Sequence, residues 1–382
     1  MGTRDAASGA GARGSRSSKT HTVSRQIGIA PWPEDDGNPY QSLFYGALEP
    51  FGIRRVRGLV INDQYLRDHA NDIDAIHLHW PEYAWRVHGS RLDRQARLLV
   101  GFSRFLKLSS RLGIARIWTA HNVRPHEVYS PLDHVGYYLV ARNADLIIAH
   151  GADARREVLS RYRPRCPVVT MPQGNYAAAY PVPREAAIVR AESGWRADVP
   201  LLVCVGALRP YKGFELAIEA VGRLGGQVQL VIAGSAKEQP YVEQLRRMAT
   251  SAGSVVILDR TLSDQEFADL ISASDAVLLP YARITTSAVL LAAWTFGRGV
   301  VATPLPYFDE FVRPRPAAGC VSEAWSAAAF AAAIQRYLSI DASVRTSAAR
   351  QAAAEFTWER AATLVTDAIR QAVVKRGDLA RT

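Results

Sequence analysis

Residues 201–213 read LLVCVGALRPYKG, an apolar run followed by a turn that contains Gly206, Arg209 and Lys212. A short, continuous apolar run with β-branched residues, closed by a glycine, predicts a strand buried inside a parallel sheet. A helical segment follows at residues 214–224. The stretch therefore predicts one strand–turn–helix unit of an α/β fold.

The same alternation continues on both sides of this unit. We expect strands at residues 27–31, 75–79, 114–120 and 145–150, and again at 227–233, 255–258, 276–280 and 300–303. Helices are expected at 40–50, 93–112 and 152–161. The proline-rich segment 163–200 is interpreted as a connector. The pattern predicts two Rossmann-like domains with parallel sheets, and ligands bound in a cleft at the carboxyl ends of the strands.

The chain has 382 residues, more than a single core usually holds. We expect a disordered basic tail at 1–24, an N-terminal acceptor-binding domain at 25–180, a C-terminal nucleotide-sugar domain at 181–355 and a final helix at 356–382 that packs back on the first domain. The tail has almost no large apolar side chain with which to offset the entropy of ordering. It also lacks the apolar core of a secretory signal, and no run of about 18 apolar residues follows it. We therefore expect a cytoplasmic protein that does not cross the membrane.

Three cysteines lie far apart and in no metal-binding or redox spacing, and Cys204 is expected to be a buried thiol. The net charge of +10 predicts an anionic partner: a nucleotide diphosphate, a nucleic acid or an acidic membrane surface. The basic residues are scattered through both halves and form no nucleic-acid-binding motif. We therefore expect no nucleic-acid partner.

Two cations, Arg209 and Lys212, stand where a buried strand turns into a helix, with Gly213 beside them. Cations and free backbone N–H groups at such a turn suit a diphosphate, whose negative charge grows as the sugar leaves. A solvated turn with two exposed cations is the alternative. Thr286 and Ser287 form a second candidate anion site before the apolar run 288–296, although a simple helix cap explains the same residues.

Histidine and glutamate gather after two strands of the first half, in the runs 77–83 and 121–127. Both types can act as general bases near neutral pH. The candidate bases are Glu82, His121 and Glu127. One of His77 and His79 is expected to point into the sheet packing instead. The aromatic side chains Trp80, Tyr83 and Trp85 suit either a sugar-stacking platform or the rim of a core.

The aspartates of the segment 72–74 precede their strand, so they are interpreted as caps, and no metal or other cofactor is expected. On the helix at 91–112, five cations lie on one side and an apolar stripe on the other. Such a helix can rest on anionic lipid at the inner face of the membrane and bring a lipid-linked acceptor to the cleft. A helix that only packs its apolar stripe on the sheet is the alternative.

The second half resembles glycosyltransferase family 4 in residues 206–213, 274–280 and 356–360. The whole chain resembles the β-mannosyltransferases of bacterial exopolysaccharide assembly, through residues 38–40, 77–83, 121–127 and 209–213. The resemblance implies a GT-B fold and places Arg209 and Lys212 at the phosphate clamp. It also implies that the acceptor contacts the following residues: Asn38, Tyr40, His79, Trp80 and Asn122. Family 4 enzymes carry two glutamates near the donor sugar, whereas this chain has Ile284 and Ala292 there.

The sequence therefore predicts a metal-independent enzyme that moves a hexose, mannose from GDP-mannose being the first candidate, to a glycan or lipid-linked acceptor. Because the two glutamates are missing, the resemblance favours an inverting transfer with one base from the N-terminal domain. Two alternatives stay open: a degenerate protein that binds a nucleotide sugar without turnover, and a sugar-nucleotide epimerase with the same fold.

Overall fold

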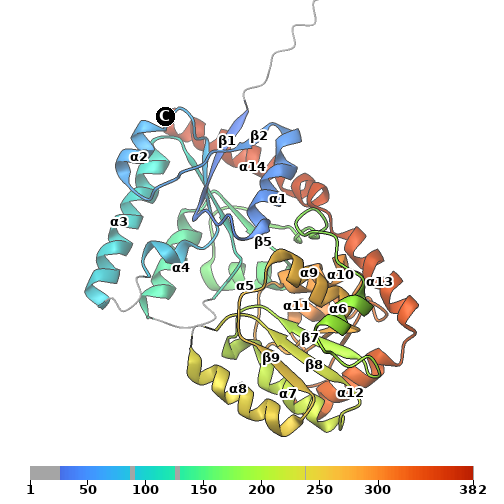
Figure 1. Ribbon diagram of the computed structural model, residues 1–382. Helices are drawn as coiled ribbons and strands as arrows, with labels where there is room; N and C mark the ends of the chain where they lie inside the picture. Colours follow the sequence, from blue (N-terminus) through green and yellow to red (C-terminus); the bar gives the residue numbers. More distant parts are fainter. Residues whose placement is uncertain (1–25, 87–90, 125–129, 237, 382) are drawn as a thin grey trace, which may run out of the picture.

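A computed structural model describes residues 26–86, 91–124, 130–236 and 238–381. The described chain forms two α/β domains, each built on a parallel sheet of six strands (Figure 1). Every strand pairing in both sheets is parallel, and the central strands are continuously buried because helices cover both faces, whereas the edge strands β2, β6 and β9 are partly exposed.

The N-terminal sheet has the strand order β2-β1-β3-β4-β5-β6. Its strands are β1 (Ile27–Trp32), β2 (Ile53–Arg55), β3 (Ala75–Leu78), β4 (Ala115–Thr119), β5 (Leu146–Ala149) and β6 (Val168–Thr170). The helices of this domain are α1 (Pro39–Leu48), α2 (Asp63–Asp68), α3 (Leu92–Arg111), α4 (Leu132–Asn143) and α5 (Ala152–Tyr162), with short 3-10 turns η1 (Glu49–Phe51) and η2 (Pro81–Ala84).

The C-terminal sheet has the order β12-β11-β10-β7-β8-β9. All its strands are parallel, but successive strands are added to one side of β7 up to β9 and to the other side from β10 on, as in a dinucleotide-binding fold. Its strands are β7 (Leu201–Val205), β8 (Gln229–Ala233), β9 (Val255–Leu258), β10 (Ala276–Leu279), β11 (Val300–Ala302) and β12 (Gly319–Val321). Its helices are α6 (Ala186–Glu192), η3 (Pro210–Lys212), α7 (Phe214–Arg223), α8 (Gln239–Ala252), α9 (Asp264–Ala273), α10 (Ala288–Thr295), α11 (Pro306–Phe311), α12 (Ala327–Leu338) and α13 (Ala342–Glu355).

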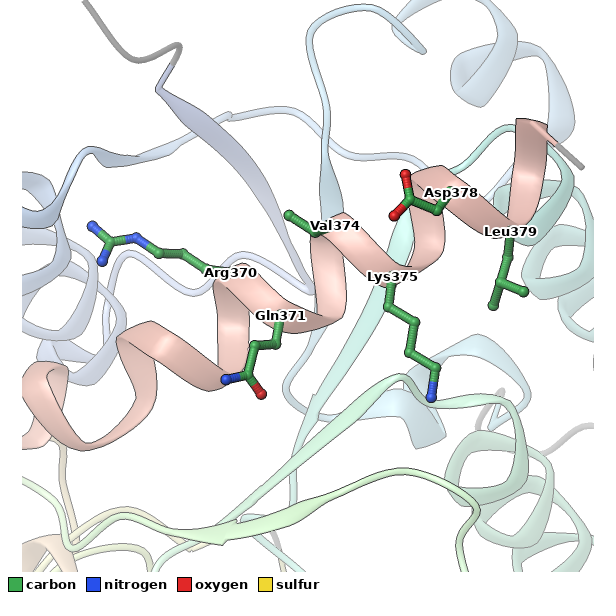
Figure 2. A pocket seen from close by; sticks show the side chains of 6 residues that line it. All are labelled: Arg370, Gln371, Val374, Lys375, Asp378 and Leu379. Atoms are coloured by element: carbon green, nitrogen blue, oxygen red, sulfur yellow. The ribbon is translucent and has the colours of Figure 1, made fainter.

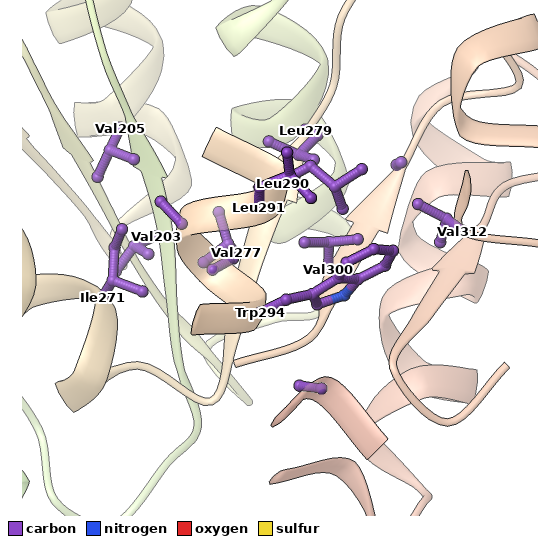
Figure 3. Close-up of a cluster of buried hydrophobic side chains, with 14 of the residues drawn as sticks. Val203, Val205, Ile271, Val277, Leu279, Leu290, Leu291, Trp294, Val300 and Val312 are labelled. Carbon is purple, nitrogen blue, oxygen red and sulfur yellow. The ribbon is translucent and has the colours of Figure 1, made fainter. Parts of the chain in front are cut away.

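One core of the C-terminal domain lies between its sheet and the helices α9 and α10. Figure 3 shows Val277 of β10 and Val300 of β11 near Trp294, whose ring is fully buried, and Val203 and Val205 of β7 in the same cluster. The indole N–H donates to the carbonyl of Ala318 at 2.9 Å, so this ring leaves no buried donor unpaired. This core fixes the positions of β7 and β10, and thereby the positions of the turns that follow the two strands.

The last helix, α14 (Trp358–Arg381), crosses back to the N-terminal sheet (Figure 1). Its buried side packs with α1, β4 and β5, and its Arg376 forms an ion pair with Asp145. The chain passes between the domains twice, once near Asn175 and again near Phe356. These two crossings are joined, because the Trp358 indole donates to the carbonyl of Asn175 at 2.7 Å and the Asn175 backbone amide donates to the carbonyl of Phe356. Both crossings therefore form one linked hinge.

All nine strands expected from the sequence are present, within two residues at each end. The interpretation of residues 163–200 as a connector alone was wrong, because β6 and α6 lie within it. The prolines that suggested irregular structure flank these elements: Pro167 precedes β6, and Pro181 and Pro183 precede α6. The short strands β2 and β12 also escaped prediction. Each has only three residues, and their sequences, Ile-Arg-Arg and Gly-Cys-Val, lack the β-branched apolar run of the equally short β11, which reads Val-Val-Ala.

Candidate active site

The candidate site lies where the carboxyl ends of the two sheets meet. A hydrogen bond and an electrostatic interaction join residues just past strand ends of opposite domains. The Ala152 amide at the start of α5 donates to the Glu310 carboxylate of α11 at 2.9 Å. Tyr83, in η2 after β3, is close enough to Arg209 after β7 for that cation to lower its pKa, although the larger effect of burial raises it. These contacts place Arg209 beside the N-terminal domain.

The turn after β7 is shaped by two glycines in the left-handed region. Gly206 has φ +113, and a Cβ there would lie 2.4 Å from the Lys212 ammonium. Gly213 has φ +63, and a Cβ there would lie 2.2 Å from the Pro280 carbonyl oxygen. Only glycine allows both close approaches. The turn thereby brings the Lys212 ammonium back over the end of β7 and next to the end of β10.

The Lys212 ammonium lies 5.7 Å from the centre of the Tyr281 ring. Desolvation lowers the pKa of Lys212 to about 8, and the neighbouring Arg209 cation adds to this shift. Within the described parts of the chain, no carboxylate forms an ion pair with Lys212. A half-buried ammonium that lacks a carboxylate partner and lies near a second cation is arranged to receive an anion.

The second predicted anion site is the start of α10. Ser287 is the N-cap, and its hydroxyl accepts from the Leu290 amide at 3.2 Å. The cap alternative raised by the sequence therefore describes Ser287 in this structure. The Thr286 hydroxyl is buried and has no geometric hydrogen-bond partner, and it lies near the Tyr307 hydroxyl, whose pKa is raised chiefly by burial to about 12.

A hydrogen-bonded chain of buried histidines runs beneath the N-terminal side of the cleft, across the carboxyl ends of β3, β4 and β5. It joins His77, His79, His121 and His150. The Tyr45 hydroxyl bridges His77 Nδ1 at 2.7 Å and His79 Nε2 at 3.0 Å. His79 Nδ1 lies 3.1 Å from His121 Nε2, and His121 Nδ1 lies 3.3 Å from His150 Nε2.

The ends of this chain are a hydroxyl and a carbonyl. His77 Nε2 lies 2.8 Å from the Thr119 hydroxyl, and His150 Nδ1 lies 2.9 Å from the Met171 carbonyl oxygen. Burial lowers the pKa of all four imidazoles, that of His77 to about 3 and that of His150 to about 4. All four are therefore neutral near pH 7.

The expectation that His77 and His79 divide between sheet packing and the site was wrong. Residues two apart in a strand point to the same face, so both join the same chain. Sequence reasoning also missed His150 and Tyr45. His150 directly follows β5, and a search for polar side chains after every strand would have found it. Tyr45 lies inside α1, and nothing in its helical spacing marks it.

The remaining acceptor-side candidates have varied surroundings. Trp80 is half-buried and stacks on His121, with ring centres 4.8 Å apart. Tyr40 is buried with its ring edge against His121, at 4.6 Å. Asn38 is the N-cap of α1, and its side chain accepts from the Tyr40 amide. Asn122 is half-buried beside His121 in sequence. Asn38, Trp80 and Asn122 are therefore the more accessible members of the predicted acceptor set, whereas Tyr40 and His79 are buried.

Of the carboxylate candidates, Glu82 is 7% exposed and lies against Tyr137 and Arg86 of the N-terminal domain. Among the described residues, no group lies within hydrogen-bond distance and angle of the Glu82 Oε2 atom, and burial raises the pKa of the Glu82 carboxyl group. Glu127 lies outside the described residues. Trp85 is fully buried and donates to Asp133 at 3.0 Å, so it belongs to the core and not to a sugar platform.

Residues 199–339, which include the phosphate-type turn and the start of α10, match the family model Glycosyl transferases group 1. The chain carries a glycosyltransferase group 1 domain. The glycosyltransferase is 26% identical over 275 residues to a GDP-mannose:glycolipid 4-beta-D-mannosyltransferase of Xanthomonas campestris pv. campestris, an alignment that covers 71% of each chain. It is 29% identical over 240 residues to a D-inositol 3-phosphate glycosyltransferase of Geodermatophilus obscurus, covering 59% of this chain and 52% of that one.

Solved structures agree with the GT-B fold of this glycosyltransferase. Anabaena Alr3699/HepE in complex with UDP matches with a TM-score of 0.69 at 16% identity, covering 91% of this chain and all of that one. The sucrose-phosphate synthase of Thermosynechococcus elongatus matches with a TM-score of 0.68 at 17% identity, covering 92% and 100%. Two Rossmann-like domains with parallel sheets are therefore confirmed as the architecture.

The glycosyltransferase has no carboxylate at the two positions where family 4 enzymes are expected to carry glutamates. Ile284 lines a small cavity of about 20 Å³ between the domains, together with Gly151, Tyr307 and Glu310. Ala292 is buried inside α10. The C-terminal domain contributes the Glu310 carboxylate to the lining of this cavity, and Glu310 accepts hydrogen bonds from the start of α5. Asp153 and Glu157 line it from the N-terminal domain.

Other features of the glycosyltransferase lie away from the cleft. A cavity of about 660 Å³ is lined by side chains of α14 alone, which Figure 2 shows along one helix with no convergent polar groups. The described residues contain no group of ligands arranged for a metal ion. Within the same residues, no helix combines the length and apolar character needed to span a bilayer.

Proposed function

We propose that this glycosyltransferase moves a hexose from a nucleotide sugar to a glycan or lipid-linked oligosaccharide acceptor in polysaccharide assembly. The observation that carries the proposal is the turn after β7, which holds two cations near each other beside the opposite domain. A departing nucleoside diphosphate needs positive charge at that point, where the cleft is partly dry.

Arg209, Lys212 and Gly213 form the proposed diphosphate site, with Thr286 and Ser287 beyond them. The Lys212 ammonium has lost part of its hydration and has no described carboxylate partner, so a bound diphosphate restores its interactions. The buried Thr286 hydroxyl, close to the Tyr307 hydroxyl, is a further donor near the start of α10. No metal ion is needed for this arrangement, because the cations themselves offset the charge of the leaving group.

The proposed donor is GDP-mannose. The relative from Xanthomonas is named for that donor and for a glycolipid acceptor, and its alignment covers both domains of this chain. The HepE structure was solved with UDP, so a uridine donor is the other candidate for a thermal-shift panel. A ligand that binds only the folded state raises the melting temperature, which ranks the donors directly.

The transfer is proposed to invert the anomeric centre with a base from the N-terminal domain, because Ile284 and Ala292 cannot act as carboxylates. His121, Glu82 and Glu127 are the candidates. His121 follows β4 at the cleft side and stacks with the accessible ring of Trp80, so it is our first choice. Glu82→Gln and His121→Ala are each expected to slow turnover while donor affinity stays nearly unchanged; loss of donor binding would assign the residue to the donor site instead.

A lipid-linked acceptor would be presented at the outer face of α3. Its apolar side packs into the core through Leu99, Phe102 and Phe105, as the packing alternative predicts. Its cations are exposed, and so are Leu92 and Val100 on the same helix. Exposed cations interspersed with apolar side chains suit the surface of an anionic membrane. Sedimentation with anionic and neutral vesicles tests this contact.

The decisive test combines transfer with donor binding. Arg209→Ala and Lys212→Ala should each lower kcat/KM by about 10²-fold or more, because each removes charge that stabilises the departing diphosphate. The matched control is Arg223→Ala, an exposed cation at the far end of α7, which should keep full activity. Unchanged transfer in both clamp variants would refute the site. Donor consumption without added acceptor would instead indicate epimerisation or hydrolysis.

A further inference from the structure

The contact between His150 and the Met171 carbonyl, at one end of the histidine chain, determines which atom donates and which accepts in every hydrogen bond of the chain. A carbonyl oxygen only accepts, so His150 must carry its proton on Nδ1 to bond Met171. Because His150 is neutral, its Nε2 is then an acceptor, and His121 must donate from Nδ1. His121 Nε2 is in turn an acceptor, and His79 donates to it from Nδ1.

The same logic continues to the other end. His79 Nε2 accepts from the Tyr45 hydroxyl, whose oxygen accepts from His77 Nδ1. His77 Nε2 accepts from the Thr119 hydroxyl. All four neutral histidines are therefore Nδ1–H tautomers, and each ring nitrogen has a partner. The lone pair of His121 Nε2 is held by a single N–H group, that of His79.

We propose that His150, anchored by the Met171 carbonyl, is the positioning residue of the catalytic base: it sets His121 as the Nδ1–H tautomer, which leaves Nε2 unprotonated, and it shares the proton that His121 takes up. This inference rests on the proposed function, in which His121 is the base. It adds His150 and the Met171 carbonyl, which no motif identified, in the place where other enzymes use a carboxylate to orient a catalytic histidine.

In the transfer step, the acceptor hydroxyl replaces His79 as the donor to His121 Nε2, and His79 Nδ1–H donates to the acceptor oxygen instead. The acceptor oxygen bonds to C1 of the sugar as the bond from C1 to the diphosphate oxygen breaks. The hydroxyl proton passes to His121 Nε2, and the diphosphate leaves with the electron pair toward Arg209 and Lys212.

The imidazolium that forms keeps its bond to His150, since its Nδ1–H already donates to His150 Nε2. That proton can pass to His150, which then donates from both nitrogens, to His121 and to the Met171 carbonyl. No hydrogen bond on this side is lost. Titratable groups of neighbouring elements also face the histidine chain. Tyr40 and Tyr45 of α1 are neutral near pH 7, and Arg55 of β2 forms an ion pair with Glu34.

Two substitutions of His150 separate its two tasks. His150→Gln keeps an acceptor near the Nε2 position but cannot take a proton. His150→Phe removes both. Nitrogen-15 NMR of the histidine rings distinguishes the tautomers in full-length protein. We expect the Nδ1–H tautomer of His121 in the wild type and in His150→Gln, and its loss in His150→Phe.

The kinetic expectation runs in parallel. His150→Gln should lower kcat about 10-fold and His150→Phe about 10²-fold or more, with donor affinity within about twofold of wild type, because only the proton-transfer step is affected. Donor-induced thermal shifts confirm that each variant is folded. An Nε2–H tautomer of His121 in the wild type would overturn the inference, and so would a wild-type kcat in His150→Phe. If the wild type transfers no sugar, the proposed function fails, while the NMR result still decides the tautomer.

Discussion

At the residue scale, the turn after β7, which forms the proposed site for the sugar donor, depends on two glycines at positions that leave no room for a Cβ atom. Gly213 approaches the Pro280 carbonyl oxygen, a backbone atom that cannot move away as a flexible side chain would. Gly206 approaches the mobile end of Lys212 instead. The two glycines therefore differ in consequence: one protects the fold of the turn, and the other protects the position of a functional cation.

Gly213→Ala is expected to lower the free energy of unfolding by about 1–3 kcal/mol, because it combines a left-handed backbone with a clash against backbone. Urea denaturation measures the change. The matched control is Gly46→Ala in α1, where a Cβ meets nothing within 4 Å, and which should stabilise the protein by up to about 1 kcal/mol. Equal stability of both variants would contradict the role of the close approach.

At the element scale, the domains are joined by helices that belong to both. The ring of Trp358 begins α14 and packs over Gly174 of the other crossing, where a Cβ would meet it at 2.5 Å. The start of α5 makes a second junction, since its Ala152 amide donates to Glu310 of the opposite domain. The first junction is held by backbone and indole hydrogen bonds and a buried ring, whereas the hydrogen bonds of the second come from one side chain, Glu310.

Trp358→Ala should cost about 3–5 kcal/mol, the usual loss for removing a buried tryptophan, and should loosen the coupling between the domains. Calorimetry is expected to show a lower melting temperature and a broader or divided transition. Val374→Ala, at a position on the same helix that is 61% exposed, should change stability by less than about 0.5 kcal/mol. A single unshifted transition in Trp358→Ala would refute the hinge.

Glu310→Ala should release the start of α5 while leaving the core intact. The amides near Ala152 are expected to exchange with deuterium faster, because they lose their acceptor in the other domain. Asp309→Ala is the control, since that neighbouring carboxylate pairs with Arg313 inside its own domain. Unchanged exchange in Glu310→Ala would show that this contact does not hold the domains together.

At the scale of the whole molecule, the buried histidines couple stability to pH. Their pKa values in the folded state lie below the ordinary value of 6.5, so the unfolded chain binds more protons between the two. Stability is therefore greatest above about pH 6.5 and falls as the pH drops toward the folded pKa values, which reach about 4 for His150 and about 3 for His77.

Each such histidine adds a slope of up to about 1.4 kcal/mol per pH unit in that window. We expect the free energy of unfolding to fall steeply between about pH 6 and pH 4, as measured by urea denaturation at several pH values. His150→Gln removes one of these titrating groups, so it should lower the slope of the free energy of unfolding against pH by up to about 1.4 kcal/mol per pH unit. The same slope with and without His150 would show that this residue is not held neutral in the fold.

The sequence by itself determined the α/β class, nine of the twelve described strands and the glycine-bounded turn with its two cations, because apolar runs, β-branched residues and turn glycines are local signals. It also placed His77, His79 and His121 at strand ends. Only the tertiary structure decided that these side chains join His150 and Tyr45 in one directed chain, because strand order and helix packing bring together residues about 30 to 40 positions apart. The same reason explains the contact of Glu310 with α5, since no local pattern records which loops meet across a cleft.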